Sequence, residues 1–217
     1  MSQQVLIIGG GGRIGRRVAA DLLRHTNVRM TLTGRRPQPS FALHSRQQYQ
    51  SLRLEDRARV RAAIAAHDLV IHCAGPFRTR DFDLLARCIA QTTPYLDVAD
   101  SPDYVGEALA FSEVAQAAGV TCIVSTGVFP GISNSMVRQG IEQLDQASHV
   151  HLSYLVAGSG GAGVTEMRTT FVELQTPFEA KGNARWIAIR PYSEREVLPF
   201  PDPYNRGAGV YWFNTIE

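Results

Sequence analysis

Hydrophobic positions in the first two thirds of the chain follow two alternating patterns. The aliphatic run Val5–Ile8 has no polar position, which is typical of a strand buried on both faces of a parallel sheet. Ile14, Val18 and Leu22 then recur every four positions and predict a helix. Further strands are expected at 28–32, 52–54, 69–73, 95–98 and 121–125, with helices at 60–64, 82–90 and 102–118. Strands separated by helices indicate an α/β fold with a doubly wound parallel sheet.

Polar residues and glycines predict where several helices begin and end. Glu55 or Asp56 is expected to cap the helix at 60–64, and Gly119 to end the helix at 102–118. Ser133 or Asn134 is expected to cap a later helix. The side chains of that helix predicted to point inward are Met136, Val137, Ile141 and Leu144.

The pattern changes after about residue 148. A long strand is expected at 150–156, followed by a glycine-rich loop at 158–163 and a helix at 164–174. Short strands are then expected at 186–189, 196–200 and 210–213, which suggests a mixed or antiparallel unit. We therefore predict an α/β domain at 1–130 and a second, smaller α+β domain at 131–217.

Composition narrows the class of protein. With 217 residues, 44% of them hydrophobic, the chain is long enough for a buried core. No apolar run approaches the roughly 20 residues that a membrane span needs, and no basic segment precedes the first one. The three cysteines lack C-x-x-C spacing, so reduced thiols in a cytoplasmic protein are expected.

Charge is distributed unevenly. Residues 1–61 hold 12 Arg and 3 acidic residues, a balance of +9, so the remainder carries −7 of the net +2. A basic first third predicts a polyanionic partner, either a nucleic acid or a phosphorylated cofactor. Lysine occurs once, as Lys181.

The segment GGGRIG follows the first predicted strand and opens the first predicted helix. In this context G-x-G-x-x-G is the fingerprint of a dinucleotide site. Gly10 permits the tight turn, Gly12 lets the backbone approach a pyrophosphate, and Gly15 allows close packing of helix on strand. The helix N-terminus, with Arg13 and Ile14, supplies amide donors to the anion. The alternative is a glycine-rich turn without a ligand.

The end of the second strand indicates which dinucleotide binds. An NAD site has an acidic residue about 20 positions after the fingerprint, whereas here Arg35 and Arg36 occupy that place. No acidic residue lies between Asp21 and Glu55. A guanidinium pairs with a 2′-phosphate that a carboxylate would repel, which favours NADP(H). The alternative is a pair of solvated arginines.

The fourth strand ends in small residues. In open α/β sheets ligands lie beyond the carboxyl ends of the strands, so Ala74, Gly75, Pro76 and Phe77 are expected to border the ribose and nicotinamide of the cofactor. Cys73 is interpreted as a small buried residue, since no partner base is identifiable.

Other polar residues are weaker candidates. Asp97 ends the fifth strand, where it either orients a substrate and moves a proton or holds a loop by hydrogen bonds; Asp100 is expected to be structural. His72 is interpreted as a satisfied core histidine. His149 and His151 have no third ligand nearby, so no metal site is predicted.

Several segments together resemble the saccharopine dehydrogenase-like oxidoreductases: VLIIGGGGRIGRRVAADLL, TGRR, DLVIHCAGPF, PYLDVADSPDY and TGVFPGISN. The resemblance covers residues 4–145 and extends more loosely through PFEAKGNARWIAIRPYS. It implies a Rossmann domain that binds NADP(H) and a second domain that closes over the substrate. Members of the family are longer, so we expect the second domain to be incomplete.

The leading hypothesis is therefore an NADP(H)-dependent oxidoreductase, with Asp97 near the substrate. The resemblance implies hydride transfer at a C=N or C–N bond, or at C=C of a lipid-like substrate. A non-catalytic NADP(H)-binding sensor is the alternative, and a nucleic-acid partner is not expected. Short-chain dehydrogenase chemistry is excluded, because Tyr-x-x-x-Lys is absent around Lys181. The aromatic segment Val210–Phe213 predicts a strand edge that is covered, either by pairing in a homodimer or by further residues of the second domain. The alternative is a strand paired wholly within its own chain.

Overall fold

The computed structural model describes residues 2–39, 41–153, 167, 171–172, 175, 177–182, 185–191, 193, 196–203 and 208–210. The chain divides into two compact units, of which the first runs to Met136 and the second begins at Val137. Within the described residues, no helix is both long and apolar enough to cross a membrane.

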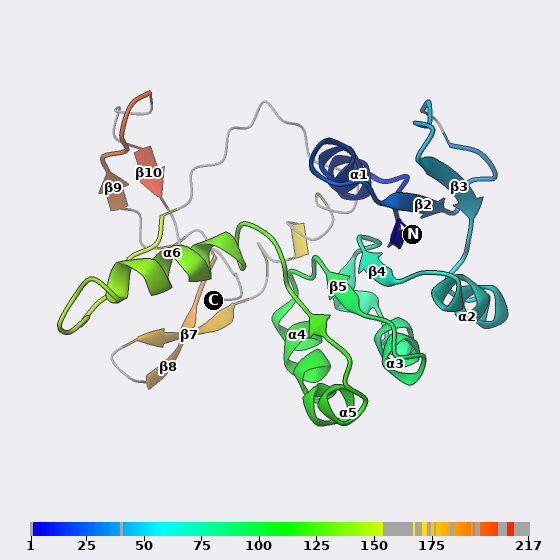
Figure 1. Ribbon diagram of the computed structural model, residues 1–217. Coiled ribbons are helices and arrows are strands. Elements are labelled where there is room, and N and C mark those ends of the chain that lie inside the picture. Colours follow the sequence, from blue (N-terminus) through cyan, green and yellow to red (C-terminus); the bar gives the residue numbers. More distant parts are fainter. Residues whose placement is uncertain are drawn as a thin grey trace. The chain divides into compact units, whose positions relative to one another are not determined.

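The first unit is built on a parallel sheet, which in the described residues has six strands in the order β3-β2-β1-β4-β5-β6 (Figure 1). The strands are β1 (Gln4–Ile8), β2 (Arg29–Gly34), β3 (Gln47–Ser51), β4 (Leu69–His72), β5 (Tyr95–Asp97) and β6 (Cys122–Ile123). This order belongs to the Rossmann fold, in which the chain reverses its direction of travel between β1 and β4. The predicted Rossmann-type sheet is confirmed.

Helices cover the two faces of the sheet. Helix α1 (Arg13–His25) lies on one face (Figure 1). The opposite face is covered by α2 (Arg57–Ala65), α3 (Asp83–Ala90), α4 (Pro102–Leu109) and α5 (Ser112–Ala117). Alternate β1 side chains supply the two cores, since Val5 and Ile7 pack on the α1 side and Leu6 and Ile8 on the other. All four are buried, which is why residues 5–8 of β1 include no polar side chain.

The third strand differs from the prediction. Leu52 and Leu54 follow β3 instead of forming it, and β3 has the polar sequence QQYQS. It pairs only with β2, through Met30–Gly34, and so forms an edge of the sheet. Its side chains are mostly half-buried, because an edge strand packs on the core less completely than a central one. The strand therefore carries no hydrophobic pattern.

Two other boundaries were predicted wrongly. The helix expected at 102–118 is interrupted at Ala110 and Phe111, which separate α4 from α5. The strand expected at 121–125 is limited to Cys122 and Ile123. Two helix ends agree with the prediction: the Asp56 side chain accepts the Arg59 amide at the start of α2, and Gly119 has a φ of +66° after α5.

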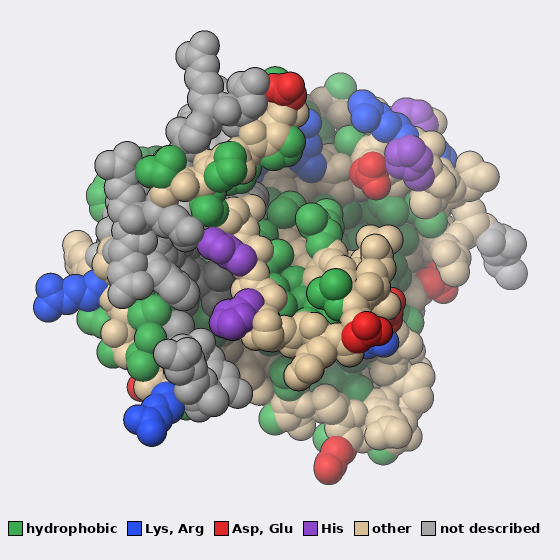
Figure 2. All heavy atoms as spheres, turned by 90° about the vertical axis from the view of Figure 1, so that its left-hand side faces the viewer, with side chains coloured by type: hydrophobic (Ala, Val, Ile, Leu, Met, Phe, Trp, Pro, Cys, Tyr) green, Lys and Arg blue, Asp and Glu red, His purple; other side chains and the backbone are tan. Residues whose placement is uncertain are grey.

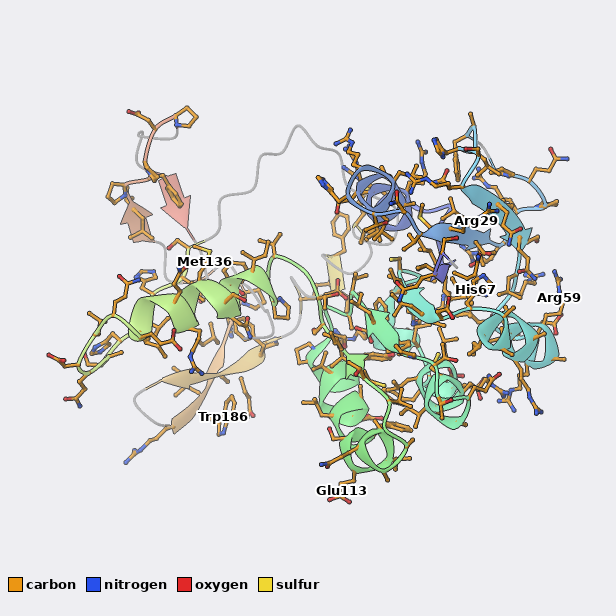
Figure 3. All side chains as sticks on the ribbon, viewed as in Figure 1. Arg29, Arg59, His67, Glu113, Met136 and Trp186 are labelled. Carbon is orange, nitrogen blue, oxygen red and sulfur yellow. The ribbon has the colours of Figure 1, made fainter. Side chains whose placement is uncertain are left out.

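Helix α6 (Ile132–Ile141) begins before both predicted caps, so Ser133 and Asn134 lie inside its first turn. Asn134 acts from inside the first turn, where its Oδ1 accepts the Gly131 amide at 3.3 Å. The predicted inward packing is also wrong, since Met136 is 61% exposed and Leu144 59% exposed. Figure 3 shows Met136 on α6, and Figure 2 shows hydrophobic side chains open at the surface.

The second unit contains two antiparallel strand pairs in its described part, in agreement with the predicted mixed or antiparallel unit. They are β7 (Phe178–Gly182) with β8 (Arg185–Ile189), and β9 (Glu196–Leu198) with β10 (Ala208–Val210). Trp186 on β8 is 67% exposed (Figure 3). Residues 150–153 form no strand. The rest of that predicted strand, the loop at 158–163, most of the helix at 164–174, and 211–213 lie outside the described residues, so the homodimer stays a prediction.

Candidate cofactor site

The loop between β1 and α1, which we term the glycine loop (Gly9–Gly12), is a tight turn tied to β2. The Gly10 amide donates to Ile7 O at 3.0 Å, and the Gly12 amide donates to Gly9 O at 2.8 Å. The Gly11 amide reaches across to Thr33 O at 3.0 Å. The loop is therefore fixed at the carboxyl ends of two neighbouring strands, where this fold binds its ligands.

The surroundings of each glycine show which ones the fold itself requires. A Cβ built on Gly10 would lie 2.9 Å from Leu32 Cα, and one on Gly15 would lie 2.6 Å from Gly10 Cα. Both glycines are therefore needed for packing. Among the atoms of the described residues outside its chain neighbours, a Cβ on Gly12 would have only Gly9 O within 4 Å, at 3.0 Å. The open space beside Gly12 fits a group that approaches the backbone closely, as a pyrophosphate does.

Helix α1 begins at this open space. Its N-cap residue is Gly12, which offers no side-chain cap, and its first turn contains no acidic residue. The positive end of the helix dipole therefore faces the loop without a carboxylate beside it. Arg13 and the 51%-exposed Ile14 lie in this first turn.

The predicted 2′-phosphate residues lie at the end of β2. Arg35 and Arg36 follow Gly34 directly, and both are exposed. Tyr49 on β3 fixes the backbone at this point, because its hydroxyl donates to Arg36 O at 3.0 Å. Tyr49 was not among the predicted site residues, because its polar strand carries no hydrophobic pattern that would locate it.

The loop after β4 touches the glycine loop. A Cβ built on Gly9 would lie 3.0 Å from the backbone and Cβ of Ala74. Arg80 holds this second loop: its Nε donates to Ala74 O at 2.9 Å and its Nη2 to Gly75 O at 3.4 Å. Ala74, Gly75 and Pro76 are half-buried. Arg80 was missed in the sequence, where no pattern distinguishes it from other loop arginines.

Phe77 is placed differently from its neighbours. Its side chain is 3% exposed and belongs to the core between the sheet and helices α2–α5. The ring packs edge-on against His72, with 4.9 Å between centroids, and against Tyr104 at 5.1 Å. The expected contact of Phe77 with a cofactor is therefore limited to its backbone.

Asp97 is fully buried at the carboxyl end of β5. Its Oδ1 accepts the amides of Ser125 at 2.8 Å and Ala99 at 3.0 Å, and its Oδ2 accepts the Tyr95 hydroxyl at 3.0 Å. Burial raises the pKa of this carboxyl, while the three donors oppose the shift. Of the two roles left open by the sequence, the geometry favours holding a loop, and we do not assign Asp97 to catalysis.

The neighbouring titratable side chains, His72 and Cys73, also pack in or against the core. Burial raises the pKa of the Cys73 thiol to about 12 and lowers the pKa of His72 to about 3, so both are neutral near pH 7. His72 Nδ1 lies 3.0 Å from the Tyr95 hydroxyl. Since that hydroxyl donates to Asp97, Nδ1 carries the proton. Within the described residues Nε2 is buried without a hydrogen-bond partner of good geometry, although the backbone of Ala74 is near enough to oppose the lowering of the His72 pKa.

Residues 5–123 match the family model described as the saccharopine dehydrogenase NADP binding domain. Among solved structures, apo saccharopine dehydrogenase (L-Glu forming) from Saccharomyces cerevisiae is similar, with a TM-score of 0.53 and 19% identity over 65% of this chain. A wide-type short-chain dehydrogenase/reductase from Veillonella parvula, in complex with NADP, has a TM-score of 0.44 and 16% identity over 57% of this chain and 68% of its own.

The match covers only part of the yeast enzyme, because the chain spans 31% of that protein's length. The family resemblance predicted from the sequence is confirmed, and so is NADP as the cofactor.

Proposed function

Because the chain belongs to the saccharopine dehydrogenase NADP-binding family, we propose that it is an NADP(H)-dependent oxidoreductase. NADP(H), when bound, supplies or accepts a hydride. The substrate class we propose is a small or lipid-like molecule whose reacting bond is C=N or C–N, or C=C.

The observation that supports this proposal most is the open space beside Gly12 at the N-terminus of α1. Gly10 and Gly15 are required by packing, whereas the position of Gly12 leaves room for a ligand. In the proposed arrangement the first turn, with Arg13 and Ile14, holds the pyrophosphate.

The remaining predicted residues complete the proposed cofactor site. Arg35 and Arg36 bind the 2′-phosphate, because each guanidinium offers paired donors to its oxygens. The backbone of Ala74, Gly75 and Pro76 borders the nicotinamide side, since it meets the glycine loop at Gly9.

A cofactor titration tests the proposal. We expect the wild-type protein to bind NADPH more tightly than NADH, and the double variant Arg35→Ala/Arg36→Ala to lose this preference. Removing a charge-assisted pair costs about 1.5–3 kcal/mol, or roughly 10- to 150-fold in affinity. Equal affinities in the wild type would contradict the assignment. A screen of imine, enoyl and carbonyl compounds, followed by NADPH absorbance, then tests turnover.

A non-catalytic NADP(H) sensor is the second candidate, and one observation favours it. The three titratable side chains described above at the ends of β4 and β5, His72, Cys73 and Asp97, are turned into the core. None of them is placed to exchange a proton with a substrate. Tight NADPH binding without turnover of any compound in the screen supports the sensor, and turnover excludes it.

A further inference from the structure

A third arginine lies at the start of the helix that follows the glycine loop. Arg16 is in the first turn of α1, where its amide donates to Gly12 O at 3.0 Å. Its guanidinium carbon lies over the ring of Phe41, 4.9 Å from the ring centroid. This is cation–π geometry, in which the ring attracts the cation and limits its conformations.

Phe41 itself is packed against the glycine loop. A Cβ built on Gly11 would lie 3.9 Å from Phe41 Cε1 and 3.4 Å from Tyr49 Cε2. Two aromatic rings therefore flank Gly11, and the Tyr49 hydroxyl is bonded to Arg36 O. The Phe41 ring thus links Arg16 to this glycine, and the Tyr49 ring links it to the backbone of Arg36.

This position matters because of where the fold places the adenosine. In Rossmann domains the residue at the end of β2 contacts the 2′ position of the adenosine ribose. Gly11 is hydrogen-bonded to β2 at Thr33 O, one residue before the strand's last residue, Gly34. The ring under the Arg16 guanidinium therefore borders a glycine that is bonded to the end of β2, where the 2′ substituent lies in this fold.

We propose that Arg16, oriented by the ring of Phe41, is a specificity-determining residue that binds the 2′-phosphate of NADP(H) together with the arginines after β2. A guanidinium that lies over a ring keeps its in-plane N–H donors for a phosphate. This inference deepens the proposed function and rests on its placement of the adenosine end of the cofactor.

The test compares Arg16→Gln with Arg17→Gln, a neighbouring exposed arginine of the same helix. Successive helical residues point about 100° apart, so Arg17 is a matched control for helix charge. Dissociation constants for NADPH and NADH are measured at one fixed salt concentration. Arg16→Gln should weaken NADPH binding roughly tenfold and change NADH binding less than about twofold. Arg17→Gln should leave the ratio of the two constants unchanged.

Two further variants examine the role of the ring and of the charge. Phe41→Leu keeps an apolar side chain but removes the π face, and should lower the NADPH preference in the same direction by a smaller factor. Arg16→Lys keeps the charge without the paired donors, and should recover part of the loss. Both variants remain informative if Arg16→Gln fails to fold.

The outcomes separate this inference from the proposed function. An unchanged NADPH preference in Arg16→Gln, with a wild type that prefers NADPH, overturns the role of Arg16 alone. An equal loss of NADPH and NADH affinity also overturns it, because the residue would then act on a part common to both cofactors. A wild type that binds neither cofactor contradicts the proposed function instead.

Discussion

Replacing Gly12 by valine should separate cofactor binding from folding. Gly12 has extended backbone angles, φ −81° and ψ 178°, which any residue adopts. Within the described residues outside its chain neighbours, its added Cβ would meet only Gly9 O, at 3.0 Å. The expected cost to stability is about 1 kcal/mol, from this contact and from a poorer N-cap. Melting should therefore fall by roughly 2–4 °C.

Binding should fall far more than stability. The valine side chain would occupy the open space where the pyrophosphate contacts the amides of α1, and losing even one such charge-assisted contact costs about 2 kcal/mol, roughly 30-fold in affinity. Gly15→Ala is the comparison, because its Cβ would be 2.6 Å from Gly10 Cα. This overpacking should cost about 1–3 kcal/mol in stability.

Circular dichroism melting and NADPH titration measure the two effects. A folded Gly12→Val protein that binds NADPH with wild-type affinity would refute the phosphate role of the glycine loop. A Gly15→Ala protein that melts at the wild-type temperature would show that the contacts around Gly15 are easily relaxed.

Three other predictions follow from the buried polar groups and the loop arginine. Tyr95→Phe removes the hydroxyl that contacts His72, Asp97 and Tyr104, and should lower the free energy of unfolding in urea by about 1–3 kcal/mol. Tyr104→Phe removes one contact at 3.3 Å and should lower it less. Equal losses in the two variants would contradict this network. Burial lowers the pKa of His72 to about 3, from a value of 6.5 in the unfolded chain. Below about pH 6.5 the unfolded state therefore binds a proton that the folded state does not. The free energy of unfolding then falls by up to roughly 1.4 kcal/mol per pH unit as the pH drops toward 3. Urea unfolding at pH 7 and pH 5 should show this loss in the wild type and a smaller one in His72→Leu; an equal loss in both refutes the shift. Arg80→Ala should weaken NADPH binding several-fold by releasing the loop after β4, whereas Arg78→Ala, an exposed control, should not, and equal affinities in titration would exclude this positioning role.

The central strands were predictable because they are buried on both faces. Val5–Ile8 and Leu69–His72 have almost no polar side chains, so hydrophobicity alone locates them. Strand β3 was predicted in the wrong place, because Gln47–Ser51 is held in the sheet by backbone pairing with β2. Backbone pairing does not require hydrophobic side chains, so the sequence shows no hydrophobic pattern there. Leu52 is buried, but it lies just after the strand.

The candidate site shows the same division. Gly10, Gly12 and Gly15 are recognisable because their spacing reflects backbone geometry that is local in sequence. The role of Asp97 depends on the amide of Ser125, 28 residues away, and the place of Arg16 depends on Phe41 in a separate loop. Contacts of this kind follow from the tertiary fold, so a residue list identifies the candidates but not their partners.

The short pairing of β6 with β5 affects how this part of the first unit opens to hydrogen exchange. Strand β6 pairs with β5 through only two residues, Cys122 and Ile123. Ser125, with a φ of +64°, is held instead by Asp97 Oδ1 and, through its own hydroxyl, by Ala99 O at 2.7 Å. In native-state hydrogen exchange, protection of the Ser125 amide would then report the opening of β5, because a carboxylate of that strand is its acceptor. Strand β5 and the edge of the sheet beyond it would exchange as one cooperative unit, even though the ladder between β5 and β6 is short.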